Sequence, residues 1–199
     1  MALGCSERII RIRSKKDMNF ELKAEIIEVN LDTVDINGFK YNLHLMRVGT
    51  HERFKVLLPI YSDVSVGNCI VSENWIITRL GKGNNPVDLC VRVDKFELVE
   101  PEGFEVSKYL NTKVTGMFLN SEKCTLRTIG PDRKPFYMAT IKIKDSFGIS
   151  YDMIIVAFGN QAKRLSTVKK TSVIECGVTV KSRKNNDGYE LAVINFEVK

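Results

Sequence analysis

The sequence repeats itself, and this repeat limits the possible folds more than any other feature. The segment Leu89–Leu98 (LCVRVDKFEL) aligns with Tyr189–Val198 (YELAVINFEV). Upstream, Phe54–Tyr61 aligns with Tyr151–Phe158, and both segments begin and end with an aromatic residue. A sequence that matches itself when it is shifted by about 100 residues is typical of a duplicated structural unit. We therefore expect a basic arm over residues 1–18, a first domain over 19–99, a linker over 100–110 and a second domain over 111–199.

Both halves consist of short runs of β-branched and aromatic residues separated by Gly, Asn and Asp, which is typical of strands. No helical pattern of 10–15 residues lies between these runs, so an all-β fold is favoured over alternating strands and helices. A single short helix is expected at Asn160–Leu165, with Asn160 as its N-cap, and a loop at the equivalent Tyr61–Gly67. The expected strands are Phe39–Val48, Phe54–Ile60, Asn68–Leu80, Leu89–Val99, Lys113–Leu119, Cys124–Ile129, Phe136–Lys144, Tyr151–Phe158, Val173–Val180 and Tyr189–Val198.

Each half therefore reads as five strands with a helix or loop between the third and the fourth. That order is typical of the OB-fold, a small Greek-key barrel that binds oligonucleotides or oligosaccharides. The prediction is two tandem five-stranded OB-fold barrels, with the short helix in the second. Four aromatic residues in apolar strand patterns are expected in the core: Phe20, Trp75, Phe96 and Phe196.

Several classes of protein fit the sequence poorly. No window approaches the roughly 18 apolar residues of a spanning helix, and the N-terminus lacks the apolar core of a secretory signal, so we expect a cytoplasmic protein. The 5 cysteines stand singly, without a CxxC pair, which argues against a zinc site or a disulfide framework and favours buried thiols. With only 2 histidines, His44 and His51, and no P-loop at Gly81–Asn85, we expect neither an enzyme nor a metal or other cofactor.

The positive charge is unevenly distributed. Residues 1–100 hold 14 basic and 14 acidic residues, whereas residues 101–199 hold 16 basic and 10 acidic, so the second half carries the whole net charge of +6. Between the basic arm and the linker, residues 17–100 are acidic, with 9 basic against 13 acidic. A basic second half suits a polyanion such as nucleic acid, although a solvated cationic surface would have the same composition.

The segment Thr140–Leu165 (TIKIKDSFGISYDMIIVAFGNQAKRL) resembles the central part of bacterial single-stranded-DNA-binding proteins. Phe147 matches an aromatic residue in a loop of that family, and Phe158-Gly159 matches an aromatic-glycine pair that ends a strand. The run Lys181–Lys184 resembles a basic segment that follows the fourth strand. Asn185-Asn186 replace a Trp that the family often carries, and Asp152 stands near the place of another, with Tyr151 beside it. The acidic tail that recruits partner proteins in the family has no counterpart before Lys199.

The resemblance implies binding of single-stranded DNA, chiefly by the second barrel and with little sequence preference, because aromatic rings stack on any base and cations contact phosphates. Replication, recombination and DNA transfer are possible settings, in a monomer or homodimer. The expected stacking residues are Phe147 and Phe158, with Tyr137, Tyr151 and Tyr189 as further candidates. The expected phosphate contacts are Lys142, Lys144, Lys163, Arg164, Lys169, Lys170, Lys181, Arg183 and Lys184.

Two alternatives stay open on the sequence alone. A pair of barrels could serve assembly with other proteins and bind no nucleic acid, and the acidic first barrel in particular could pair with another protein or pack against its twin. RNA is the other alternative, because stacking platforms accept both sugars.

Overall fold

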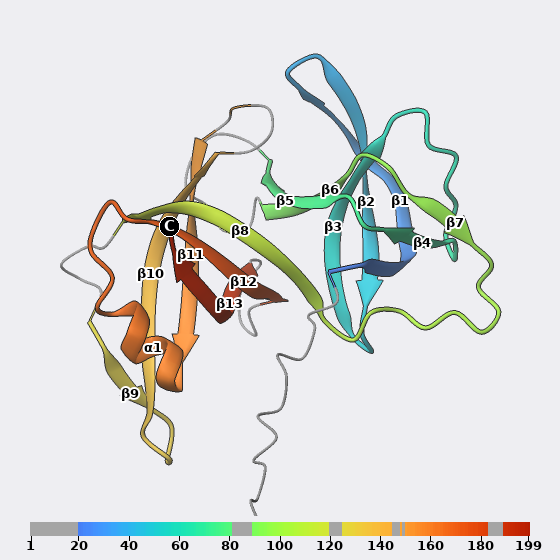
Figure 1. Cartoon of the computed structure of the whole chain (residues 1–199). Coiled ribbons are helices and arrows are strands. Elements are labelled where there is room, and N and C mark those ends of the chain that lie inside the picture. The colour runs from blue at the N-terminus through green and yellow to red at the C-terminus, as the bar shows by residue number, and fades with distance from the viewer. Residues whose placement is uncertain (1–19, 81–88, 120–124, 145–147, 149, 183–188) are drawn as a thin grey trace, which may run out of the picture.

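The computed structural model describes residues 20–80, 89–119, 125–144, 148, 150–182 and 189–199. Two β-barrels lie side by side, with the N-terminal barrel on the right and the C-terminal barrel on the left of Figure 1. Both barrels are built from β-strands, as the repeated pattern of short apolar runs predicts. The expected fold of two tandem OB-fold barrels is confirmed.

The first barrel contains seven strands within the described residues. In sheet order they are β5, β6, β3, β2, β1, β4 and β7, and β3 and β6 run parallel. The fourth strand of the five-stranded barrel is divided into β4 and β5, because the chain bends at Glu73-Asn74. The fifth strand is divided into β6 and β7, because the chain bends again after Val93. The strand bounds are β1 Leu22–Ile36, β2 Phe39–Val48, β3 Glu52–Pro59, β4 Cys69–Ser72, β5 Trp75–Arg79, β6 Leu89–Val93 and β7 Glu97–Val99.

The second barrel closes completely. Its strands follow the order β11, β13, β12, β8 and β10, and β10 pairs again with β11, so every strand of this ring has two neighbours. A short strand, β9, is added to the end of β10. The bounds are β8 Leu110–Leu119, β9 Arg127–Ile129, β10 Lys134–Lys144, β11 Ser150–Phe158, α1 Gly159–Leu165, β12 Val173–Ser182 and β13 Tyr189–Val198.

The helix prediction is confirmed in place but not in its cap. Helix α1 spans Gly159–Leu165 and buries Ala162 and Leu165, while the equivalent stretch of the first barrel is a loop. The N-cap is Phe158, which makes no side-chain capping bond, and Asn160 lies inside the helix. Gly159 has a φ of 58°, a conformation that glycine adopts without steric cost. The chain can therefore turn directly from β11 into α1, and the helix begins at Gly159, one residue before the predicted start at Asn160.

Four strand expectations differ from the structure. Of the predicted strand Cys124–Ile129, the structure has only β9, Arg127–Ile129, as a strand within the described residues. The strand β1, with 15 residues, was not expected, because Glu28, Asp32 and Asp35 interrupt its apolar pattern. The predicted strands Asn68–Leu80 and Leu89–Val99 are each divided in two. Polar residues at the bends, such as Asn74 and Asp94, mark the breaks.

The hydrophobic core is continuous across the two barrels, and one cluster of buried side chains includes Trp75 of the first and Phe196 of the second. Both are buried, as expected, and the Trp75 indole donates to the Phe20 carbonyl at 2.7 Å. Phe96 is partly buried against the same cluster. Phe20 is only half-buried, with Lys113 Nζ 5.3 Å from its ring centroid.

Equivalent aromatic residues of the two repeats join the barrels. The Phe54 ring of β3 stacks on Tyr189 of β13 with the centroids 5.2 Å apart. Tyr151, which aligns with Phe54 in the repeat, donates its hydroxyl to the Ile77 carbonyl of β5 at 2.6 Å. Each barrel therefore contacts its twin through the first part of its third strand.

Cys69, Cys90 and Cys176 are buried, as expected of thiols in a core. Burial raises the pKa of the Cys176 thiol to about 12. Cys5, Cys124 and the Gly81–Asn85 turn lie outside the described residues. In the described part of the chain, no helix has the length and apolar character needed to cross a bilayer, and no three potential ligands gather to hold a metal ion.

Candidate nucleic-acid interface

Strand β10 alternates strictly between core and surface. Side chains at odd positions point into the barrel and those at even positions point outward, as the pleat of a strand requires. Met138, in the middle of the outward row, is 44% exposed. The inward side chains are Tyr137, Ala139, Ile141 and Ile143, and the outward ones are Phe136, Met138, Thr140, Lys142 and Lys144.

One end of this outward face carries an aromatic pair. Phe136 lies opposite Phe158 of β11, and their ring centroids are 5.5 Å apart at a tilt of 51°. Phe158 is 39% exposed, so part of its ring faces solvent. On the other side, Arg127 of β9 is the cross-strand partner of Phe136 and is exposed. Two rings and a guanidinium therefore form a row across three strands.

The other end of the face carries amines. Lys142 and Lys144 are both exposed, and Lys142 lies between Met117 of β8 and Asp152 of β11. At 3.4 Å per residue, the six steps from Phe136 to Lys142 span about 20 Å. Asp152 offsets part of the positive charge at this end. The face thus offers rings and cations along one strand.

A further group of cations surrounds α1. Lys163 and Arg164 lie in the last turn of the helix, and Lys169 and Lys170 are exposed in the loop that follows. The Arg164 guanidinium lies over the Phe196 ring, 4.9 Å from its centroid, which orients this side chain. Phe158 caps the start of α1, so the helix leads from the aromatic pair to this group of cations at its other end.

Tyr137 is not part of the interface. Its side chain is 1% exposed and packs in the core, so it cannot stack on a base in this structure. The physical reason is the strand period, which places Tyr137 on the same face as Ile141 and Ile143. The prediction of Tyr137 as a stacking residue is therefore wrong, and Tyr137 is a core residue.

Tyr151 and Tyr189 also serve another purpose, because both lie between the barrels. Tyr151 is buried and bonded to Ile77, as described above. The Tyr189 hydroxyl accepts the Lys55 N–H at 3.3 Å and donates to the Arg53 carbonyl at 3.4 Å, and burial raises the pKa of this phenol. Rings held in this way are not stacking platforms, and both are withdrawn.

Lys181 lies at the border of the two barrels. Its side chain is exposed, and its charge acts on Glu52 of the first barrel. Burial raises the pKa of the Glu52 carboxyl, and the Lys181 cation opposes that rise. This charge interaction links Lys181 to the first barrel.

Three expected contacts lie outside the described residues. Phe147 belongs to the connection between β10 and β11, and Arg183 and Lys184 belong to the connection between β12 and β13. They stay predictions.

Sequence reasoning missed Phe136, Met138 and Arg127. The missing signal was strand parity, because Phe136 and Met138 share the even positions of Lys142 and Lys144. The alternation that separates Lys142 and Lys144 from Ile141 and Ile143 extends back to Phe136. Arg127 had no comparable signal, since β9 is only three residues long and is exposed throughout.

Comparison with known proteins supports the fold. No family model matches the sequence, and no curated protein matches it. Among solved structures, wild-type single-stranded DNA binding protein from Thermus aquaticus superposes with a TM-score of 0.59 at 12% identity, covering 90% of this chain and 91% of that chain. A deletion mutant of the same protein superposes with a TM-score of 0.59 at 11% identity, covering 90% and 93%.

A shorter match is PriB from Ralstonia solanacearum, with a TM-score of 0.39 at 12% identity, covering 45% of this chain and 97% of that one. The Thermus aquaticus structures span both barrels, so the arrangement of two OB-folds in one chain occurs in a known protein. The expected resemblance to single-stranded-DNA-binding proteins is confirmed for the fold.

Proposed function

We propose that this protein binds single-stranded DNA, without enzymatic activity, chiefly through the outer face of β10 and β11 in the second barrel. The observation that carries the proposal is the shared outward face of Phe136, Phe158, Lys142 and Lys144. Strands 2 and 3 of an OB-fold form the face that commonly binds oligonucleotides, and β10 and β11 hold those two positions here.

The chemistry of the face suits unpaired nucleotides. An exposed ring stacks on any base, which contributes about 1–3 kcal/mol per base, and lysines that contact phosphates release bound counterions. A duplex hides its base faces inside the stack and would use only the cations. Binding is therefore expected to be selective for single strands, tolerant of sequence and weakened by salt.

The Thermus aquaticus proteins, which bind single-stranded DNA by name, support the proposal because their fold is shared over 90% of this chain. Replication and recombination are the settings in which such binding is expected.

The main test compares two exposed aromatic residues. Phe158→Ala removes a ring of the proposed face and should lower the affinity for a fluorescent oligothymidylate about 5- to 100-fold in an anisotropy titration. The matched control is Tyr109→Ala, because Tyr109 is 51% exposed but lies before β8, beside the first barrel. Equal affinities of the two variants, with circular dichroism showing both folded, would contradict the proposal.

Two companion measurements complete the test. Titration with an oligouridylate of the same length gives the preference between DNA and RNA. Light scattering with and without oligothymidylate gives the number of chains in the complex.

A further inference from the structure

The first barrel carries a second aromatic pair on its surface. Phe39, at the start of β2, is 58% exposed, and Tyr61, just after β3, is 83% exposed. The repeat places Tyr61 at the position of Phe158. Strand pairing places Phe39 at the position of Phe136, because Tyr41 lies opposite Pro59 and the same register, continued by two residues past the end of the ladder, sets Phe39 against Tyr61.

The pair borders a groove of about 520 Å³. Ile60, which is also exposed, adds an apolar wall, and Tyr41 forms part of the lining. The Tyr41 hydroxyl donates to Asp94 Oδ1 at 2.9 Å, and Arg92 Nε lies 3.2 Å from the same oxygen. The Asp94 carboxylate is thus held on two sides, so the groove has an ordered polar base under exposed apolar walls.

The surface beyond this groove differs from that of the second barrel. The residues that correspond to Met138 and Thr140 are Tyr41 and Leu43, and both are buried. They belong to a separate apolar cluster with Ile36, Leu57 and Cys90. An extended chain lying on the aromatic pair would therefore find no open strand face to follow.

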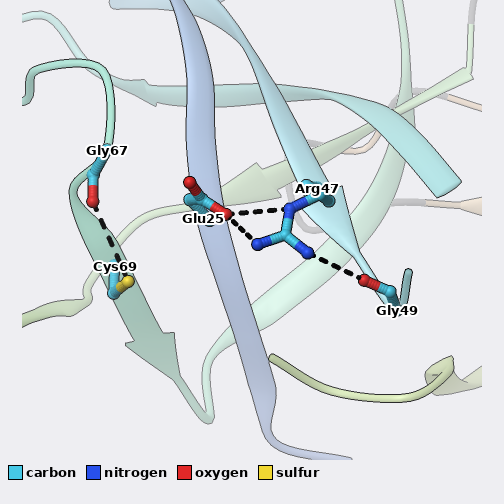
Figure 2. A network of polar contacts seen from close by, with 5 residues as sticks. All are labelled: Glu25, Arg47, Gly49, Gly67 and Cys69. Carbon is cyan, nitrogen blue, oxygen red and sulfur yellow. Dashed lines mark hydrogen bonds and ion pairs between the residues drawn. The ribbon is translucent and has the colours of Figure 1, made fainter. Parts of the chain in front are cut away.

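Of the two lysines on the outer face of β10, only one has a cationic counterpart on β2. Leu45 stands at the position of Lys142, and Arg47 at that of Lys144. Figure 2 shows that the Arg47 guanidinium is engaged: Nε donates to Glu25 Oε2 at 2.8 Å, Nη2 contacts the same oxygen, and Nη1 donates to the Gly49 carbonyl at 3.3 Å. The charge of Arg47 is therefore already compensated.

Two cations do occur on β3, where Arg53 and Lys55 replace Ser150 and Asp152. They lie next to Tyr189 of the second barrel, which bonds to the main chain of both. They are thus at the far end of β3 from Tyr61, with the buried segment Val56–Pro59 between. The aromatic groove of the first barrel is isolated from them.

The charges around the groove are mixed and, over the barrel, acidic. Asp35 lies on the hairpin that leads to Phe39, Asp63 follows Tyr61, and both are exposed. Lys40 and Lys95 line the groove itself. Over residues 17–100 the acidic residues outnumber the basic ones by 13 to 9, which favours a partner of positive charge over a polyanion.

We propose that the groove between Phe39 and Tyr61 is a protein-docking site, which takes a partner segment with a bulky apolar anchor residue and basic flanking residues. The proposal goes beyond binding of single-stranded DNA and does not rest on it. Exposed aromatic side chains beside a pocket are typical anchors of protein interfaces, and complementary charge around them selects the partner. A groove of this volume accommodates one or two large side chains.

The test uses short fluorescent peptides with one central Phe, Leu or Trp and flanks of lysine, serine or glutamate. We expect the lysine-flanked peptides to bind with the highest affinity, and the double variant Phe39→Ala/Tyr61→Ala to lower that affinity about tenfold or more. The same variant should keep its affinity for oligothymidylate within about twofold. The matched control, Phe136→Ala/Phe158→Ala, should show the reverse pattern.

Three results would overturn the docking site. They are absence of saturable binding by every peptide, tighter binding of the glutamate-flanked set, and a loss of oligothymidylate affinity in Phe39→Ala/Tyr61→Ala as large as in the control, which would make the groove a nucleic-acid site. Failure of the control variant to lose oligothymidylate affinity would count against the proposed function alone. Tyr61→Ser, which changes one highly exposed ring, repeats the test should the double variant fold poorly.

Discussion

The two barrels share a fold but present opposite kinds of surface on equivalent strands. In the second barrel the outward face of β10 is open and carries rings and lysines. In the first barrel the middle of the matching face is closed, because Tyr41 and Leu43 are buried and Arg47 is already paired. The inward positions differ as well, because Lys40, Asn42 and His44 of β2 stand where β10 has Tyr137, Ala139 and Ile141. The comparison teaches that a duplicated barrel keeps its order of strands while residues on both faces of a strand change.

The first barrel also differs from the second in the continuity of its strands. Its fourth position is divided into β4, which pairs with β1, and β5, which pairs with β6. The equivalent β12 is continuous and pairs with β8 and β13 along its length. The separate β5 presents the Ile77 carbonyl to Tyr151. The fourth strand of the first barrel is thus interrupted in the region where this barrel contacts the second.

The largest expected effect is on the free energy of unfolding, at a position that is buried in the second barrel and exposed in the first. Tyr137 fills the end of the second barrel, and the repeat places the exposed Lys40 at the same position of the first. Tyr137→Ala should lower the free energy of unfolding by about 3–5 kcal/mol, because it leaves a large cavity. Lys40→Ala should change it by less than about 0.5 kcal/mol. Urea denaturation followed by circular dichroism measures both, and similar values would refute the difference between the two cores.

The next effect concerns the lysines that only the second barrel exposes. Lys142→Glu/Lys144→Glu should weaken oligothymidylate binding. The plot of log K against log salt should become less steep, with the magnitude of its slope lower by about 1.4, because two phosphate contacts are lost. The control Lys23→Glu/Lys108→Glu makes the same change of net charge at residues beside the first barrel. Anisotropy titrations over a range of salt concentrations give both slopes. If the two slopes fall alike, net charge rather than the β10 face governs binding.

A smaller effect is expected where the barrels meet. Tyr151→Phe removes the hydroxyl that donates to Ile77 and should cost about 1 kcal/mol, since the buried carbonyl loses a partner. Tyr189→Phe should cost less, because its hydrogen bonds of 3.3 and 3.4 Å are longer and the side chain is half-buried. Thermal denaturation ranks the two variants, and an unchanged midpoint for Tyr151→Phe would show that this contact does not stabilise the pair.

The smallest effect separates the two histidines of the first barrel. Burial lowers the pKa of His44 below its usual 6.5, while its Nδ1 accepts the Asn30 N–H at 3.3 Å. The unfolded chain therefore takes up a proton as the pH falls through 6.5, and the folded chain takes it up only at lower pH. Stability contributed by neutral His44 is present above this range and lost on acidification, by at most about 1.4 kcal/mol per pH unit.

The measurement is the free energy of unfolding between neutral and mildly acidic pH. His44→Gln should flatten this profile, whereas His51→Gln, at an exposed position, should leave it as in the unchanged protein. A profile that is identical in all three proteins would show that another group governs the acid sensitivity.

Much of the fold followed from patterns that are local in the chain. The segment Phe136–Lys144 alternates so regularly that its strand could be predicted almost to the residue, and α1 was expected within one residue of its start. The candidate face was only partly predicted. Phe158, Lys142 and Lys144 were expected on it, whereas Tyr137, Tyr151 and Tyr189 look like exposed aromatic residues in a strand until their neighbours are known.

By itself, the sequence determined that the chain is a duplicated all-β protein with a basic second half, because periodicity and charge are properties of short segments. Tertiary structure alone decided which aromatic residues meet solvent. Tyr151 and Ile77 lie 74 residues apart, and Tyr189 and Lys55 lie 134 apart, so no local pattern brings them together. Burial depends on what packs against a ring from elsewhere in the chain, and that packing exists only once both barrels have formed.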